Sequence, residues 1–73
     1  MSKTFHSDVA DVTVTAMLQC LGDQPWFCEV HPLDGSAPAS YIETEAYAFN
    51  AAADALDEYK EQRCLNPTTI WNL

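Results

Sequence analysis

Basic residues are nearly missing from this sequence of 73 residues. Lysine and arginine occur only as Lys3, Lys60 and Arg63. Affinity for nucleic acid comes largely from cations that neutralise phosphates, so this small supply argues against direct binding of DNA or RNA. The same shortage argues against a role at anionic membrane surfaces, which attract clusters of basic side chains. The sequence therefore favours a protein partner, and one that is itself basic.

Other features are also missing, and each absence excludes a class of protein. Two glycines cannot build a glycine-rich loop around a phosphate. No apolar run approaches the about 20 residues of a membrane-spanning helix, and the polar start lacks the apolar core of a secretory signal. The odd set Cys20, Cys28 and Cys64 has neither disulfide-framework spacing nor the short knuckles of a zinc site. We therefore expect reduced thiols in a cytoplasm, and neither a metal nor a cofactor.

Enzymatic activity is not expected either. Nucleophilic catalysis needs an activated Ser or Cys next to a base. Cys28 and His31 are three residues apart in what reads best as one strand, which places them on opposite faces. The chain therefore lacks a recognisable catalytic pair.

The dominant feature that is present is negative charge. Eleven acidic residues give a formal net charge of -8 at pH 7. The hydrophobic share of 48% and the aromatic share of 11% are nevertheless those of a folded protein rather than a disordered chain. The length allows one hydrophobic core. We predict a single α+β domain over residues 1–73, a small antiparallel sheet packed against one amphipathic helix, with a loose N-terminal arm at residues 1–8.

Alternation of side chains predicts the strands of this sheet. In chain order, the predicted strands are residues 11–21, 26–32, 38–43 and 68–73, with turns at 22–25 and 33–36. The first of these also fits a helix capped by Ser7, but the β-branched residues at 12–15 lose side-chain freedom in a helix and favour a strand. In the second strand, Trp26, Cys28 and Val30 share one face.

Residues 46–64 are predicted to form the helix, because they are rich in Ala, Leu and Glu. Ser40 or Thr44 is the predicted N-terminal cap, and Asn66-Pro67 the stop. An apolar stripe recurs at spacings of three and four residues and is expected to face the sheet. The stripe consists of Phe49, Ala52, Ala55, Leu56 and Tyr59.

Acidic residues gather on the opposite face of this helix. They form two like-charge pairs four residues apart, each of which costs about 0.2–0.5 kcal/mol in an isolated helix. Acids in the last turns also oppose the helix dipole. Such penalties fit a surface kept for binding, although a solvated face that only maintains solubility is the competing interpretation. The predicted partner-binding residues are Asp54, Asp57, Glu58 and Glu61, extended by Glu43 and Glu45, with Trp26 as an aromatic anchor.

The order strand, strand, short strand, helix, strand, combined with the acidic total, resembles small phage-encoded inhibitors of the anti-CRISPR type. The resemblance implies a non-enzymatic inhibitor that acts in the host cytoplasm. Its partner would be a basic, nucleic-acid-binding protein such as a CRISPR effector. The carboxylates would lie where nucleic acid phosphates normally lie.

A second resemblance covers about half of the chain. Its segments are Trp26-Phe27-Cys28-Glu29-Val30, Glu43-Thr44-Glu45-Ala46 and the alanine-rich residues 51–59. They are similar to the strand–helix pattern of HicB-type antitoxins. The resemblance implies an antitoxin-like or regulatory module that binds one small basic protein through its sheet edge. A structural phage accessory protein that forms a homodimer through its sheet is the third alternative.

Overall fold

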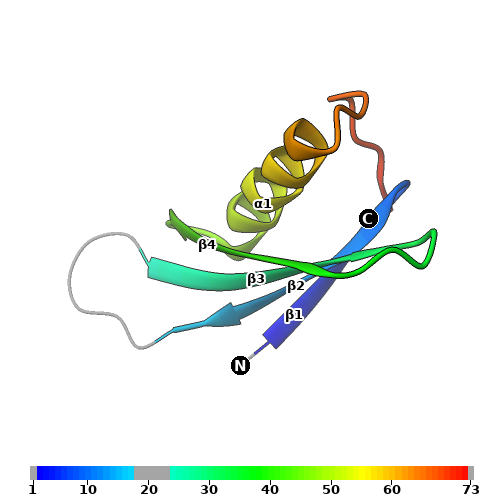
Figure 1. The fold of residues 1–73 in the computed structure, drawn as a ribbon. Helices are drawn as coiled ribbons and strands as arrows, with labels where there is room; N and C mark the ends of the chain where they lie inside the picture. Colours follow the sequence, from blue (N-terminus) through cyan, green and yellow to red (C-terminus); the bar gives the residue numbers. More distant parts are fainter. Residues whose placement is uncertain (1, 18–23, 73) are drawn as a thin grey trace.

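The computed structural model describes residues 2–17 and 24–72. Five strands form one antiparallel sheet, and one helix packs across one of its faces (Figure 1). The elements are β1 (Ser2–Ser7), β2 (Ala10–Ala16), β3 (Gln24–Pro32), β4 (Ala39–Glu45), α1 (Ala48–Gln62) and β5 (Trp71–Asn72). The α+β fold predicted from the sequence is thereby confirmed.

The strands lie in the order β4-β3-β2-β1-β5. The first four follow one another as an antiparallel meander. After β4 the chain enters α1, crosses the face of the sheet and reaches the opposite side, where β5 pairs with β1 (Figure 1). The crossover leaves β4 at one edge of the sheet and β5 at the other.

The core lies between the sheet and the helix. Val12 and Val14 of β2, together with Cys28 and Val30 of β3, point toward α1 and are buried. This confirms the predicted alternation in both strands, although residues 18–21 of the first predicted strand lie outside the described residues. Trp26 shares the face of Cys28 and Val30, as predicted.

The apolar stripe of α1 meets this layer largely as predicted. Ala52, Ala55, Leu56 and Tyr59 are buried, and the small alanine side chains let the helix axis lie close to the sheet. Phe49 is the exception, with 37% of its surface exposed.

Phe49 packs sideways in an aromatic cluster that joins three elements. Its ring centroid lies 5.6 Å from that of Phe5 in β1 and 5.5 Å from that of Trp71 in β5. The predicted last strand therefore docks, although it is shorter than residues 68–73.

The predicted loose N-terminal arm is wrong, because residues 2–7 form β1. This strand pairs with β2 along its length, from Ser2 opposite Thr15 to His6 opposite Asp11. Its side chains are mostly polar and exposed, so the sequence carries no alternating pattern. Backbone pairing and the buried Ser7 hydroxyl, which donates to the Ala10 carbonyl at 2.6 Å, hold the strand in place.

The predicted helix caps are also wrong. Ser40 and Thr44 lie within β4, since pairing with β3 uses residues 39–45. The helix begins after Tyr47 without a side-chain cap and ends at Gln62, with Cys64 in the left-handed conformation (φ 55°) in place of Asn66.

The two predicted turns have different outcomes. Of the turn predicted at 22–25, Gln24 and Pro25 belong to β3, and residues 22 and 23 lie outside the described residues. The turn at 33–36 is confirmed. Gly35 adopts φ 86° there, a conformation that favours glycine.

Candidate functional site

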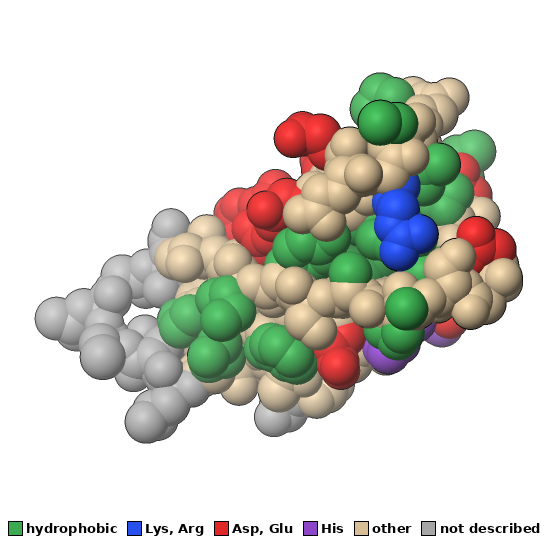
Figure 2. All heavy atoms as spheres, in the orientation of Figure 1, with side chains coloured by type: hydrophobic (Ala, Val, Ile, Leu, Met, Phe, Trp, Pro, Cys, Tyr) green, Lys and Arg blue, Asp and Glu red, His purple; other side chains and the backbone are tan. Residues whose placement is uncertain are grey.

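The four predicted carboxylates of α1 lie on the side of the helix that faces away from the core. Asp57, Glu58 and Glu61 are exposed, and Asp54 is half-buried. Figure 2 shows red acidic side chains along the helix side of the molecule, separate from the blue basic side chains. We call Asp54, Asp57, Glu58 and Glu61 the acidic helix face.

One flank of this face is directed toward β4. Burial, and then the charges of Asp54 and Glu58, raise the pKa of the Cys28 thiol to about 11. Burial, and then the charge of Glu58, also raise the pKa of the Tyr41 hydroxyl. Tyr41 in β4 donates a hydrogen bond of 2.9 Å to the side chain of Gln62 and so ties this edge of the sheet to the helix.

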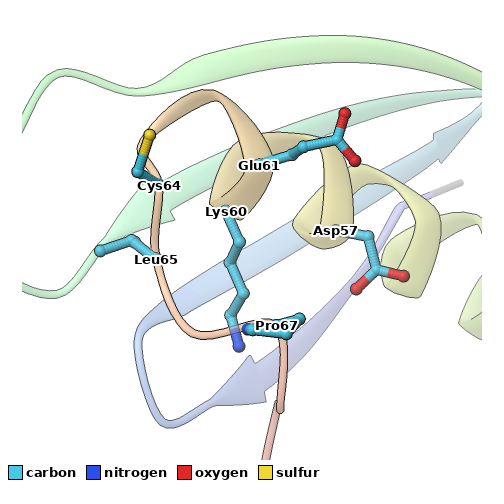
Figure 3. Close-up of a pocket in the computed structure, with 6 residues that line it drawn as sticks. All are labelled: Asp57, Lys60, Glu61, Cys64, Leu65 and Pro67. Carbon is cyan, nitrogen blue, oxygen red and sulfur yellow. The ribbon is translucent and has the colours of Figure 1, made fainter.

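The other flank borders a hollow beside the chain that follows the helix. Asp57 and Glu61 line it together with Lys60, Cys64, Leu65 and Pro67 (Figure 3). Figure 3 shows the Lys60 side chain running from the helix toward Pro67, whereas the carboxylates of Asp57 and Glu61 point away from it. The acidic helix face therefore has two flanks with different neighbours.

Lys60 does not neutralise these carboxylates, because its ammonium group is buried and donates hydrogen bonds to another segment of the chain. Only 1% of its surface is exposed. Its Nζ donates to the Thr68 carbonyl at 2.7 Å and to the Thr69 hydroxyl. The lysine thus fastens the segment before β5 to the helix.

The other two cations are also engaged elsewhere. The Nζ of Lys3 lies 5.4 Å from the ring centroid of Phe5, and the guanidinium of Arg63 lies 5.0 Å from that of Tyr59. Within residues 2–17 and 24–72, the one ion pair joins His6 and Asp11 at 2.9 Å, and it requires a protonated histidine. The acidic helix face is therefore left without an internal ion-pair partner among the described residues.

Glu43 and Glu45 lie on the helix side of β4 and are half-buried. Glu43 Oε2 is enclosed and has no hydrogen-bond partner in the described part of the chain. Trp26 lies opposite Glu43 in the β3–β4 register, and its indole N–H donates to the Glu45 carbonyl at 3.0 Å. Trp26 therefore joins β3 to β4, a structural role beside the binding role predicted from the sequence.

Sequence reasoning did not identify two strongly exposed apolar side chains. Tyr47, directly before α1, is 70% exposed, and Ile42 in β4 is 62% exposed. Ile42 pairs with Phe27 on the face of the sheet away from the helix, where both line a shallow hollow. The alternating pattern of β4 predicts that Ile42 points away from the helix. The pattern cannot show whether another element covers that face of the sheet, and among the described residues none does.

Cys28 has the properties of a core residue rather than a nucleophile. It is fully buried, and its raised pKa keeps the thiol protonated near neutral pH, whereas the thiolate is the reactive form. Cys28 and His31 lie on opposite faces of β3, as predicted. The structure therefore supplies no Cys–His pair within this strand.

A thiol-reactive maleimide is expected to label exposed Cys64 and to spare Cys28 in the native protein at about pH 7.5. Peptide mass spectrometry after short exposure measures both sites, and labelling in urea is the positive control. Equal labelling of Cys28 and Cys64 in the folded protein would contradict the expected burial.

Folding raises the pKa of Cys28 from 9.0 to about 11. The contribution of the Cys28 thiol to the free energy of unfolding is therefore complete below pH 9.0 and is lost as the pH rises toward about 11. Cys28→Ala should remove this part of the pH dependence of stability.

Within the part of the chain that the structure describes, no group of three or more His, Cys, Asp or Glu side chains is arranged to hold a metal ion. The same part contains no helix that is both long and apolar enough to cross a membrane.

No known family model matches this chain, and neither the curated proteins nor the solved structures contain a significant match to it.

Proposed function

We propose that this protein is a non-enzymatic inhibitor that binds a basic, nucleic-acid-binding protein through the acidic helix face. One observation carries the proposal. The carboxylates stand on the outer side of a packed helix, while Lys3, Lys60 and Arg63 are each engaged elsewhere in the fold. The negative charge of this face is therefore available to a partner.

The geometry suits a groove that normally holds a nucleic acid strand. The helix rises about 1.5 Å per residue, so Asp54 and Glu61 are about 10 Å apart along its axis. Successive phosphates of a strand are several ångströms apart, so the face spans a few phosphate positions. Lysine and arginine side chains that hold phosphates would pair with these carboxylates.

The rest of the fold supports this role. Packing of α1 on the sheet fixes the helix that carries the carboxylates before binding, which reduces the entropy lost on association. The net charge of -8 would steer the protein toward a positively charged groove and speed association at low salt. By its resemblance to anti-CRISPR proteins, we propose a CRISPR effector in a host cytoplasm as the partner class.

Removing the charges of the acidic helix face should weaken partner binding at low salt by at least about tenfold. The variant combines Asp54→Asn, Asp57→Asn, Glu58→Gln and Glu61→Gln. Proteins retained from a lysate by the immobilised wild-type chain are identified. For the strongest binder, affinity and its salt dependence are measured for wild type and variant. Inhibition is measured as loss of nucleic acid binding by that protein.

A matched control removes the same number of charges from other places. It combines Asp8→Asn, Asp11→Asn, Glu29→Gln and Asp34→Asn, in which each amide oxygen can still accept hydrogen bonds. This control should retain most of the affinity, because the acidic helix face is intact. Equal binding by wild type and the helix-face variant would refute the proposed function. Equal weakening in both variants would show that net charge, rather than this face, drives binding.

A further inference from the structure

The strand β4 forms a long open edge of the sheet. It contains seven residues and pairs with β3 on one side. On its other side no described strand is present. Alternate residues of an antiparallel edge strand direct their N–H and C=O groups outward, which makes such an edge a template for another strand. The helix covers a face of β4 but does not pair with this edge (Figure 1).

The two sides of this edge differ in chemistry. On the helix side lie Glu43 and Glu45. The flank of α1 that carries Glu58 faces β4, where Tyr41 donates a hydrogen bond to Gln62. On the face of the sheet away from the helix, Ile42 is exposed and shares a shallow hollow with Phe27. A strand added here would meet carboxylates on one side and an apolar surface on the other.

We propose that β4 accepts an extended strand of the basic partner, whose side chains alternate between basic and apolar. The inference rests on the proposed function and adds the way in which the partner is held. Backbone hydrogen bonds to β4 would supply affinity, and the alternation would supply specificity. Basic side chains would lie beside Glu43 and the β4 flank of α1, and apolar side chains beside Ile42.

The enclosed oxygen of Glu43 supports this occupant. A buried polar atom without a hydrogen-bond partner is unfavourable, and Glu43 Oε2 has none within the described residues. Glu43 belongs to the edge strand itself. A lysine or arginine on an added strand would bring N–H donors to this side of the edge.

A second copy of this chain is a poorer occupant of the same edge. Antiparallel pairing of two β4 strands about Ile42 would place both Glu43 side chains on one side of the joined sheet. It would also bring two acidic helix faces together, and each chain carries a net charge of -8. Like charges gathered on the same face of a joined sheet repel each other. Charge complementarity therefore favours a basic strand.

A synthetic peptide tests the edge directly. The probe alternates lysine and valine over about eight residues, roughly the length of β4. One control has the same composition with lysines and valines in separate blocks. Two further controls carry N-methyl groups either on all lysine amides or on all valine amides. These two sets of amides lie on opposite edges of an extended peptide, so each methylated peptide blocks one edge.

The alternating peptide is expected to bind at least about tenfold more tightly than the block peptide. One methylated peptide should lose binding and the other keep it. Amide hydrogen exchange across residues 39–45 should slow in the complex. Equal or absent binding of alternating and block peptides, or unchanged exchange in β4, would overturn the inference. A dimer that protects β4 without any peptide would overturn it as well.

The charge variants separate this inference from the proposed function. If the peptide tests fail but the helix-face variant loses its partner, only strand addition at β4 is refuted. If the helix-face variant binds its partner as wild type does, the proposed function is refuted whatever the peptide does.

Discussion

Lys60→Ala is expected to lower the free energy of unfolding by about 2–4 kcal/mol. The side chain of Lys60 is almost fully buried, and its ammonium donates to the Thr68 carbonyl and the Thr69 hydroxyl. Alanine would leave both acceptors without their donor and would also remove the packed aliphatic stem. Because hydrogen bonds to charged groups each contribute about 1.5–3 kcal/mol, this loss is large for so small a protein. Urea denaturation followed by circular dichroism measures it.

Two variants separate the causes. Lys60→Met keeps most of the stem but not the donors, so its loss should be smaller, at about 1–3 kcal/mol. Arg63→Ala changes the net charge by the same amount and removes the contact of an exposed guanidinium with the Tyr59 ring, at a cost of about 0.5–1 kcal/mol. If Lys60→Ala proved as stable as Arg63→Ala, the buried lysine would not anchor the segment before β5.

Trp71→Ala is expected to destabilise the protein by about 3 kcal/mol, the lower end of the range for buried aromatic side chains, because Trp71 is only half-buried. Its ring contacts Phe49 and Phe5, with centroids 5.5 and 6.3 Å away. Alanine would expose more of both phenylalanine rings. It would also remove the main attachment of β5, which pairs with β1 through only two residues.

Amide exchange and urea denaturation together check this second prediction. The Asp8 N–H, which donates to the Ile70 carbonyl at 2.9 Å, should exchange faster in Trp71→Ala, because the segment leading to β5 would open. Asn72→Ala is the matched control, since its side chain is exposed in the same strand, and it should change stability by less than about 0.5 kcal/mol. A similar small effect of Trp71→Ala would show that β5 does not depend on the aromatic cluster.

Local patterns in the sequence predicted the strands β2 and β3, the presence of the helix and the side of the helix that is buried. These elements bury one face, so their side chains alternate or recur with the period of the structure. The same reasoning failed for β1, because a strand with polar side chains carries no such pattern. It also failed for the helix start, because Ser40 and Thr44 pair with β3 instead of capping α1.

The sequence alone determined the charge of this protein, the scarcity of cations and the face of the helix that carries Asp54, Asp57, Glu58 and Glu61. These properties depend on residue type and on spacing within one element. Only the tertiary structure decided that the acidic helix face has two flanks, that the Lys60 side chain is buried and that β4 is an open edge. Each of these depends on which distant segments pack or pair together, and such contacts produce no periodic pattern in the sequence.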